Sequence, residues 1–308
     1  MIWAWLVVFA SIIWAIVNIM DKYVVEKELK DPALCAVIFG LVSTIVFEIA
    51  TFLHGIAYIP QQIAFISMIT GFIYVFGVFL YYEALERGEV SRAVPVMHTT
   101  PVFVILFASI FLGERLKGIE YIGILLLVLG AIMISIKPRR ESMIEKGKRS
   151  FKAFFRKIFG FIDIAFWITI SATIIFSIRN VLLKYIINQI SIFSIIFWMG
   201  LGSFICSLII LAFHHPRIFK KGRKGVEHLI FINAITALAF IMFSVAVSLG
   251  SVSVITALCS LQLFFVFLLA VLLSKFEPKI INEELRRSTI ELKFFALVLI
   301  LIGTLLVA

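Results

Sequence analysis

The 308-residue chain is far more apolar and less charged than a soluble protein of its length. Hydrophobic residues make up 62% of it and charged residues 15%, with a mean hydropathy of +1.13, against about 45–50% and about 25% in soluble domains. This composition excludes a soluble globular enzyme. We assign the net charge of +10 to the cytoplasmic loops of a membrane protein rather than to a nucleic-acid partner.

Long uncharged runs divide the chain into ten predicted transmembrane helices. A hydrocarbon core about 30 Å thick takes roughly 20 apolar residues at 1.5 Å each. The strands of a membrane barrel are about half as long and alternate in polarity, so we predict an all-α integral membrane protein. The predicted spans are residues 2–20, 33–53, 62–84, 90–112, 119–136, 161–187, 192–213, 228–249, 252–274 and 292–307.

The fourth predicted span contains two prolines, Pro95 and Pro101. Proline lacks the backbone N–H that a helix interior needs, and its ring clashes with the preceding turn. We therefore expect this span to be a kinked helix whose freed carbonyls are satisfied by neighbouring helices.

A basic segment lies at the middle of the chain. Residues 137–157 read KPRRESMIEKGKRSFKAFFRK, and such a run predicts a linker between two halves or a short amphipathic helix on an anionic leaflet. We divide the chain accordingly into residues 1–136, a basic linker at 137–160, and residues 161–308.

The two halves align with each other at a single offset of 162 residues. ASIIWAIVNIMDKYV, residues 10–24, falls on ATIIFSIRNVLLKYI, residues 172–186. Polar identities at a shared offset are rare by chance, so the halves are predicted to be duplicated five-helix units. The identical residues are Ala10, Ile12, Ile13, Ile16, Asn18, Lys22 and Tyr23, which meet Ala172, Ile174, Ile175, Ile178, Asn180, Lys184 and Tyr185.

An odd number of spans per unit has a topological consequence. The second copy must enter the membrane from the opposite side, which gives two inverted five-helix repeats. Inverted repeats recur in secondary transporters, where two halves rock about a central substrate site. The repeat therefore favours transport by alternating access.

A set of motifs in residues 84–134 resembles the EamA-type repeat of the drug/metabolite transporter superfamily. The second half keeps Gly250, Val252, Ser253 and Gly303, but Leu263 replaces Pro101 and Lys275-Phe276-Glu277 replaces the Gly-Glu-Arg turn. The first-half motif residues are Ala84, Gly88, Val90, Ser91, Pro101, Leu112, Gly113, Glu114, Arg115, Gly123 and Gly130.

The resemblance implies ten spans around a central cavity lined by spans 1, 3, 4, 6, 8 and 9, with spans 5 and 10 peripheral. It also implies both termini in the cytoplasm. The charge pattern predicts the reverse, because the odd-numbered connections hold 24 Lys and Arg while the even-numbered connections and the termini hold three. Members move amino acids, sugars, nucleotide sugars, other metabolites and drugs, so the substrate stays open.

Ionisable residues inside the spans are the first candidates for a substrate site, since each is costly to insert into a bilayer. Arg179 is expected either to anchor a substrate carboxylate or phosphate or to snorkel to the interface. His98 is expected to bind substrate or couple transport to protons, or else to be a hydrogen-bonded packing residue. Glu48 is a second proton-coupling candidate, with a structural ion pair as the alternative.

Amides and aromatic residues complete the predicted substrate site. Asn18 and Asn180 occupy equivalent positions in the two repeats, and they are expected to lie near two opposite gates or to join neighbouring helices. Trp14, Tyr82 and Gln262 are further candidates for the cavity wall, although Trp and Tyr also occur in interfacial belts.

The sequence thus predicts a multi-pass membrane protein, in the plasma membrane of a prokaryote, that carries a small metabolite such as an amino acid-like solute. Its expected partners are this solute, the lipid bilayer and possible coupling protons. HExxH, GxSxG and P-loop motifs do not occur, so we predict neither an enzyme nor a metal or cofactor site. A membrane scaffold or lipid-handling protein is the alternative.

Overall fold

The computed structural model describes residues 2–87, 96–115, 117–135, 164–214, 223–276 and 287–307, and within these ranges every regular element is helical. The predicted linker at 137–160 lies outside them. The helices are α1 (Ile2–Tyr23), the π-helical turn η1 (Val24–Leu29), α2 (Pro32–His54), α3 (Gln61–Arg87), α5 (Thr100–Phe111), α6 (Gly118–Ser135), α8 (Ile164–Ile187), α9 (Ile192–His214), α10 (Arg223–Leu249), α11 (Val252–Leu258), α12 (Leu261–Phe276) and α13 (Arg287–Val307).

Local chemistry sets the ends of these apolar helices. At the start of α2, Asp31 Oδ1 accepts a hydrogen bond from the Leu34 N–H at 3.1 Å, and Pro32 occupies the first turn, where a missing N–H costs nothing. Gly55, with φ of +86°, follows the last residue of α2. A positive φ is easily adopted by glycine, so the chain turns there towards α3.

Within the described part of the chain, seven segments are long and apolar enough to cross a membrane. They are α1, α2, α3, α8, α9, α10 and the run Val252–Leu269 through α11 and α12. The apolar stretches Thr100–Phe111, Gly118–Gly130 and Phe294–Gly303 are shorter. The protein is therefore a helical membrane protein, as the composition predicts.

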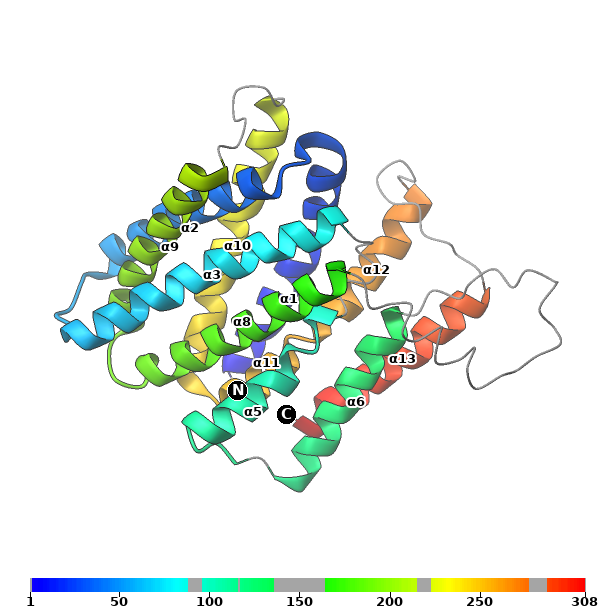
Figure 1. The fold of residues 1–308 in the computed structure, drawn as a ribbon. Coiled ribbons are helices and arrows are strands. Elements are labelled where there is room, and N and C mark those ends of the chain that lie inside the picture. The colour runs from blue at the N-terminus through cyan, green and yellow to red at the C-terminus, as the bar shows by residue number, and fades with distance from the viewer. Residues whose placement is uncertain are drawn as a thin grey trace.

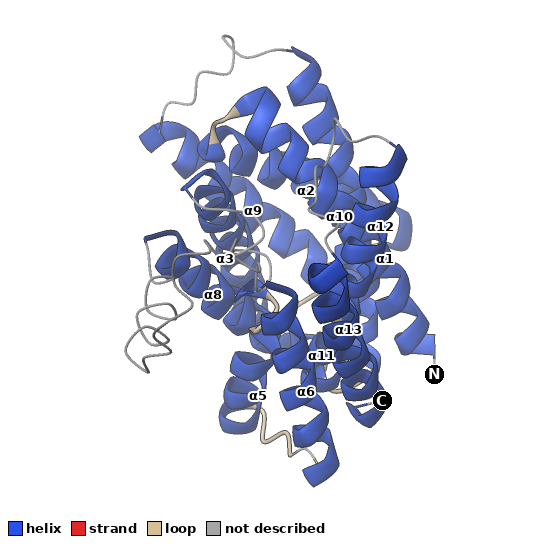
Figure 2. Ribbon diagram, turned by 90° about the vertical axis from the view of Figure 1, so that its right-hand side faces the viewer, coloured by secondary structure: helices blue, strands red, loops and turns tan. Residues whose placement is uncertain are grey.

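The helices form one bundle with a separate pair at its side. α1 packs against α10 and α12, α2 packs against α9, and α3 packs against both α8 and α9. α6 and α13 pack chiefly against each other and lie beside the main bundle (Figure 1). The beginning of α1 and the end of α13 lie at the same end of the molecule (Figures 1 and 2).

The fourth predicted span is broken rather than kinked at Pro101. Pro101 lies in the first turn of α5, which begins at Thr100, and proline is well accommodated in the first turn because that N–H has no helical partner. Just before it, the Thr99 N–H bonds to the Val96 carbonyl, three residues back, at 3.1 Å. Pro95 lies outside the described residues.

The ninth predicted span has a matching break without a proline. α11 ends at Leu258 and α12 begins at Leu261. Between them the Ser260 N–H bonds to the Ala257 carbonyl at 3.0 Å, again three residues back. Short stretches with such tight turns inside a helix are typical of hinges and functional sites, and both breaks here face the same cavity, as described below.

A carboxylate from the turn after α5 caps α11. Gly113, with φ of +66°, turns the chain, and the Glu114 carboxylate accepts hydrogen bonds from Ser251 Oγ at 2.8 Å, Ser253 Oγ at 2.7 Å and the Val252 N–H at 3.1 Å. The first N–H groups of a helix lack helical partners and carry partial positive charge. Glu114 therefore ties the end of the fourth span to the start of the ninth.

Lys184 forms hydrogen bonds with the end of α10, just before α11 begins. Lys184 Nζ donates to the carbonyls of Val247 and Gly250, at 2.9 Å and 2.8 Å, where α10 ends at Leu249. Terminal helix carbonyls favour a nearby cation, so Lys184 fixes α8 against the connection from α10 to α11.

Replacing Glu114 with Ala is expected to lower the free energy of unfolding by about 1–3 kcal/mol, because the two hydroxyls and the N–H groups at the start of α11 lose their acceptor. Thermal unfolding in detergent measures this. The matched control is Glu86→Ala, since Glu86 is exposed on α3 and should change stability by about 0.5 kcal/mol or less. Equal melting temperatures for the two variants would contradict this role of Glu114.

Candidate functional site

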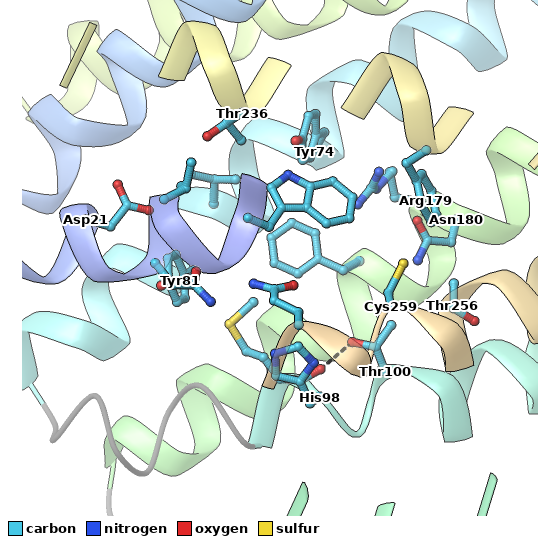
Figure 3. A pocket seen from close by; sticks show the side chains of 18 of the residues that line it. Asp21, Tyr74, Tyr81, His98, Thr100, Arg179, Asn180, Thr236, Thr256 and Cys259 are labelled. Atoms are coloured by element: carbon cyan, nitrogen blue, oxygen red, sulfur yellow. Dashed lines mark hydrogen bonds between the residues drawn. The ribbon is translucent and has the colours of Figure 1, made fainter. Parts of the chain in front are cut away.

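The described helices line a partly open cavity of ≈ 200 Å³, whose mostly apolar wall carries several polar side chains. It is lined from α1, α2, α3, α5, α8, α10, α11 and α12, and from the two helix breaks (Figure 3). All seven residues that the sequence predicts for substrate binding line this cavity: Trp14, Asn18, Tyr82, His98, Arg179, Asn180 and Gln262.

Arg179 lies inside the bundle and does not snorkel to the interface. The residue is 7% exposed, and its Nε and Nη1 atoms have no hydrogen-bond partner among the described groups. The guanidinium carbon lies 4.5 Å from the Tyr74 ring centroid and 4.7 Å from that of Phe240, with Phe176 and Phe243 slightly further away. Aromatic faces attract a cation, but they leave its N–H donors free for an anionic group.

The two symmetric amides both line this cavity, and their placement near two gates stays a prediction. Asn18 Oδ1 accepts a long hydrogen bond of 3.5 Å from the Tyr81 hydroxyl. Asn180 is buried, and its Oδ1 has no partner among the described groups. Both side chains line the one cavity because α1 and α8 both border it.

Among the polar cavity residues that sequence reasoning missed are Asn233, Thr236 and Asp21, which line the cavity but are not among the predicted residues. Asn233 and Thr236 lie three residues apart on α10, and Asn233 Nδ2 is buried without a partner in the described structure. This spacing, which places both on one helix face within an apolar run, was the available signal. The third residue, Asp21, lies at the end of the first predicted span.

Asp21 is buried at one side of the cavity. It is 5% exposed, and its Oδ1 accepts a hydrogen bond from the Tyr82 hydroxyl at 3.3 Å. Among the described residues no basic side chain forms an ion pair with it. Figure 3 shows Asp21 and Arg179 on opposite sides of the cavity, so the two charges do not neutralise each other directly.

His98 and Gln262 come from the two helix breaks. His98 lies between Val96 and Thr100, and Gln262 is the second residue of α12. Both line the cavity, together with their neighbours Met97 and Cys259. A helix break exposes backbone and side-chain polar groups where they can meet a ligand, which is how transporters build sites near the centre of the bilayer.

Glu48 lies away from this cavity. It borders a separate shallow hollow formed by α2, the segment after it and Phe197, and its Oε1 is buried without a hydrogen-bond partner among the described residues. A proton-coupling role for Glu48 stays a prediction. The alternative of an ion pair with a basic residue has no such partner in the described ranges.

Metal ligation has no support in the described part of the chain, where no group of three or more His, Cys, Asp or Glu side chains is placed to hold an ion. Within the described residues, Cys35, Cys206 and Cys259 form no disulfide bond, and Cys35 and Cys206 are buried.

Comparison with known proteins gives the family. Residues 1–136 match the model of the EamA-like transporter family. The match covers 136 of the 308 residues, so the first half of the chain is similar to this family. The fold agrees over the full length, since a protein of known crystal structure superposes with a TM-score of 0.70 over 99% of this chain and 97% of that chain. Its sequence identity is 14%, so this likeness concerns the fold alone.

Two of the curated relatives that match part of the chain are named as transport proteins of bacteria. The pseudopaline exporter CntI of Pseudomonas aeruginosa is 31% identical over 134 residues, which are 43% of this chain and 45% of the exporter. A probable amino-acid metabolite efflux pump of Escherichia coli is 26% identical over 131 residues, 39% and 44% of the two chains. The chain thus matches less than half the length of these relatives. It is a multi-pass membrane protein related to transporters.

Proposed function

We propose that the protein is a secondary transporter that moves a small organic solute across the membrane by alternating access. The observation that carries this proposal is the buried Arg179, whose Nε and Nη1 atoms have no protein acceptor among the described residues and which lines a cavity together with the amides of Asn180 and Gln262. A cavity of this kind needs a polar ligand, because a buried charge without a partner is costly. The exporter and efflux-pump relatives support the same activity.

We further propose ten spans in two inverted five-helix repeats, residues 1–136 and 161–308, joined by the linker at 137–160. The packing supports this arrangement. α1–α10 and α3–α8 are equivalent contacts when the two halves are exchanged, while α2–α9 and α6–α13 each map onto themselves. The two helix breaks also support it, since residues 98–99 and 259–260 lie within one residue of the offset of 162 that aligns the sequences.

Cysteine labelling in intact cells tests the inverted arrangement. Tyr58 follows α2, and the neighbouring Ala57 N–H donates to Ser194 Oγ at the start of α9, so Tyr58→Cys and Gln189→Cys should react on one face. Arg223→Cys, at the start of α10, should react on the opposite face. The charge bias assigns Arg223 to the cytoplasm. Reaction of Tyr58→Cys and Arg223→Cys on the same face would exclude inverted repeats.

Transport itself is tested by uptake and release of a metabolite panel in proteoliposomes, with and without an imposed pH gradient. We expect carrier-mediated flux of at least one small organic solute, and an effect of the pH gradient if protons are coupled. Empty liposomes and the Arg179→Gln variant are the controls. Absence of flux for the whole panel in both directions would favour the scaffold or lipid-handling alternative.

A further inference from the structure

The cavity holds two buried groups of opposite charge that are not paired with each other. Arg179 extends from α8 and Asp21 from α1. The guanidinium has free donors, and the hydrogen bond to Asp21 comes from a neutral hydroxyl, that of Tyr82. A buried charge in a protein is normally matched by an opposite charge. Each of these two groups is therefore available to a charged group of a ligand.

The two charges lie at different depths along α1. The Trp14 ring lies 5.7 Å from the Phe243 ring, and the Phe243 ring lies 5.8 Å from the Arg179 guanidinium carbon, so one phenylalanine ring contacts both Trp14 and Arg179. Asp21 comes seven residues after Trp14, roughly 10 Å further along the helix at 1.5 Å per residue. Figure 3 shows the same separation, with Asp21 and Arg179 at opposite sides of the cavity.

Aromatic rings and side-chain amides form the cavity wall between the two charged groups. Trp14, Phe39 and Tyr81 provide apolar surface, and Asn18 and Gln262 provide neutral hydrogen-bonding groups. A solute with an acid group alone would leave Asp21 unpaired. A solute with an amine alone would leave Arg179 unpaired, and each unpaired buried charge lowers affinity.

We propose that the cavity selects an extended zwitterion, a solute whose acid group is bound by Arg179 and whose amino group, held at a distance by an apolar chain, is bound by Asp21. This proposal rests on the proposed function, because it names the substrate class of the same cavity. A simple α-amino acid carries its two charges on one carbon and reaches one of the two residues, but not both.

Two isomeric probes show whether binding depends on the distance between the two charged groups or only on their presence. 6-Aminohexanoate and norleucine have the same atoms and the same two charged groups, but the charges are far apart in the first and adjacent in the second. Hexanoate and hexylamine each carry one of the two groups. We expect isothermal titration of the purified full-length protein in detergent at neutral pH to give at least about tenfold tighter binding of 6-aminohexanoate than of any other probe.

Two variants assign the two ends of the solute. Asp21→Asn should weaken 6-aminohexanoate binding by about tenfold or more, to the level of hexanoate, while hexanoate binding stays unchanged. Arg179→Gln should likewise weaken 6-aminohexanoate binding by about tenfold or more, to the level of hexylamine, while hexylamine binding stays unchanged. The retained probe reports that each variant is folded. Asp21→Glu should keep the preference for separated charges, and the surface variant Glu86→Gln should match the wild type.

Several outcomes would overturn the proposal: no binding of any probe to the wild-type protein, equal affinity for 6-aminohexanoate and norleucine, or an equal loss of hexanoate and 6-aminohexanoate binding in Asp21→Asn. The failure of transport is a separate result. Selective binding without flux in proteoliposomes would overturn the proposed function alone, whereas flux of solutes without regard to charge spacing would overturn the extended-zwitterion proposal alone.

Discussion

Arg179→Met is expected to stabilise the protein and to lower its transport activity by about tenfold to a hundredfold. The guanidinium is buried without a carboxylate partner in the described structure. Its desolvation therefore lowers the free energy of unfolding. The rings of Tyr74 and Phe240 offset part of this cost, by about 2 kcal/mol at most. A methionine side chain would pack its thioether against the same rings without that cost, and we expect a gain of about 1–2 kcal/mol in unfolding free energy.

The same substitution removes the group that binds the acid end of the solute. A charge-assisted hydrogen bond contributes roughly 1.5–3 kcal/mol, so affinity and flux should fall by about tenfold to a hundredfold. Such opposite changes in stability and activity are typical of functional sites. Thermal unfolding in detergent and flux in proteoliposomes are the two measurements.

Arg223→Met is the matched control for this prediction. Arg223 pairs with Glu227 on the exposed start of α10, with Nε to Oε1 at 2.8 Å. Exposed pairs of this kind contribute about 0.3–0.5 kcal/mol, so stability and flux should both stay near the wild-type values. If Arg179→Met instead unfolded more easily than the wild type, the guanidinium would be a structural element of the bundle rather than a group held ready for a ligand.

The polar lining of the cavity could be predicted because polar groups in an apolar span must face the protein interior. Arg179, Asn18 and Asn180 were found in this way, and they do meet in one cavity. Asp21 was missed because it is followed directly by a basic residue at the end of a predicted span, which is also the pattern of an interfacial residue. The helix continues to Tyr23, and this extra turn keeps Asp21 inside the bundle.

The partners of Arg179 and the second helix break could not be predicted. Tyr74, Phe176, Phe240 and Phe243 come from three different helices, and a chain with 32 Phe residues gives no local signal for choosing among them. At the ninth predicted span, Leu263 stands where the first half has Pro101, so the break before α12 has no proline to mark it.

The second large effect is expected from substitutions in the contact between α3 and α9. One glycine of each helix lies against the backbone of the other helix. A Cβ added at Gly71 would overlap the carbonyl oxygen of Met199, and one added at Gly202 would overlap the carbonyl oxygen of Met68. Ser203 Oγ also donates to the Gly71 carbonyl at 3.2 Å. Small residues allow this close backbone approach between membrane helices, which are held together by packing and interhelical hydrogen bonds.

Gly71→Ala and Gly202→Ala are therefore each expected to lower the free energy of unfolding by about 1–3 kcal/mol, since the overlapping atom is backbone and cannot rotate away. Thermal unfolding in detergent measures the loss. Gly118→Ala is the control, because a Cβ there meets nothing within 4 Å. Alanine is less flexible than glycine in the unfolded chain, so this substitution should leave the free energy of unfolding unchanged or raise it by about 0.4–1 kcal/mol.

The double variant Gly71→Ala, Gly202→Ala distinguishes local strain from separation of the two helices. If α3 moves away from α9 as a unit, the first substitution already relieves the second clash, and the double variant should lose less stability than the sum of the two single losses. Tyr74 lies one turn after Gly71 on α3, so the same movement withdraws its ring from Arg179 and should weaken solute binding. Additive losses with unchanged binding would instead mean that each clash is absorbed locally and that α3 keeps its place beside the cavity.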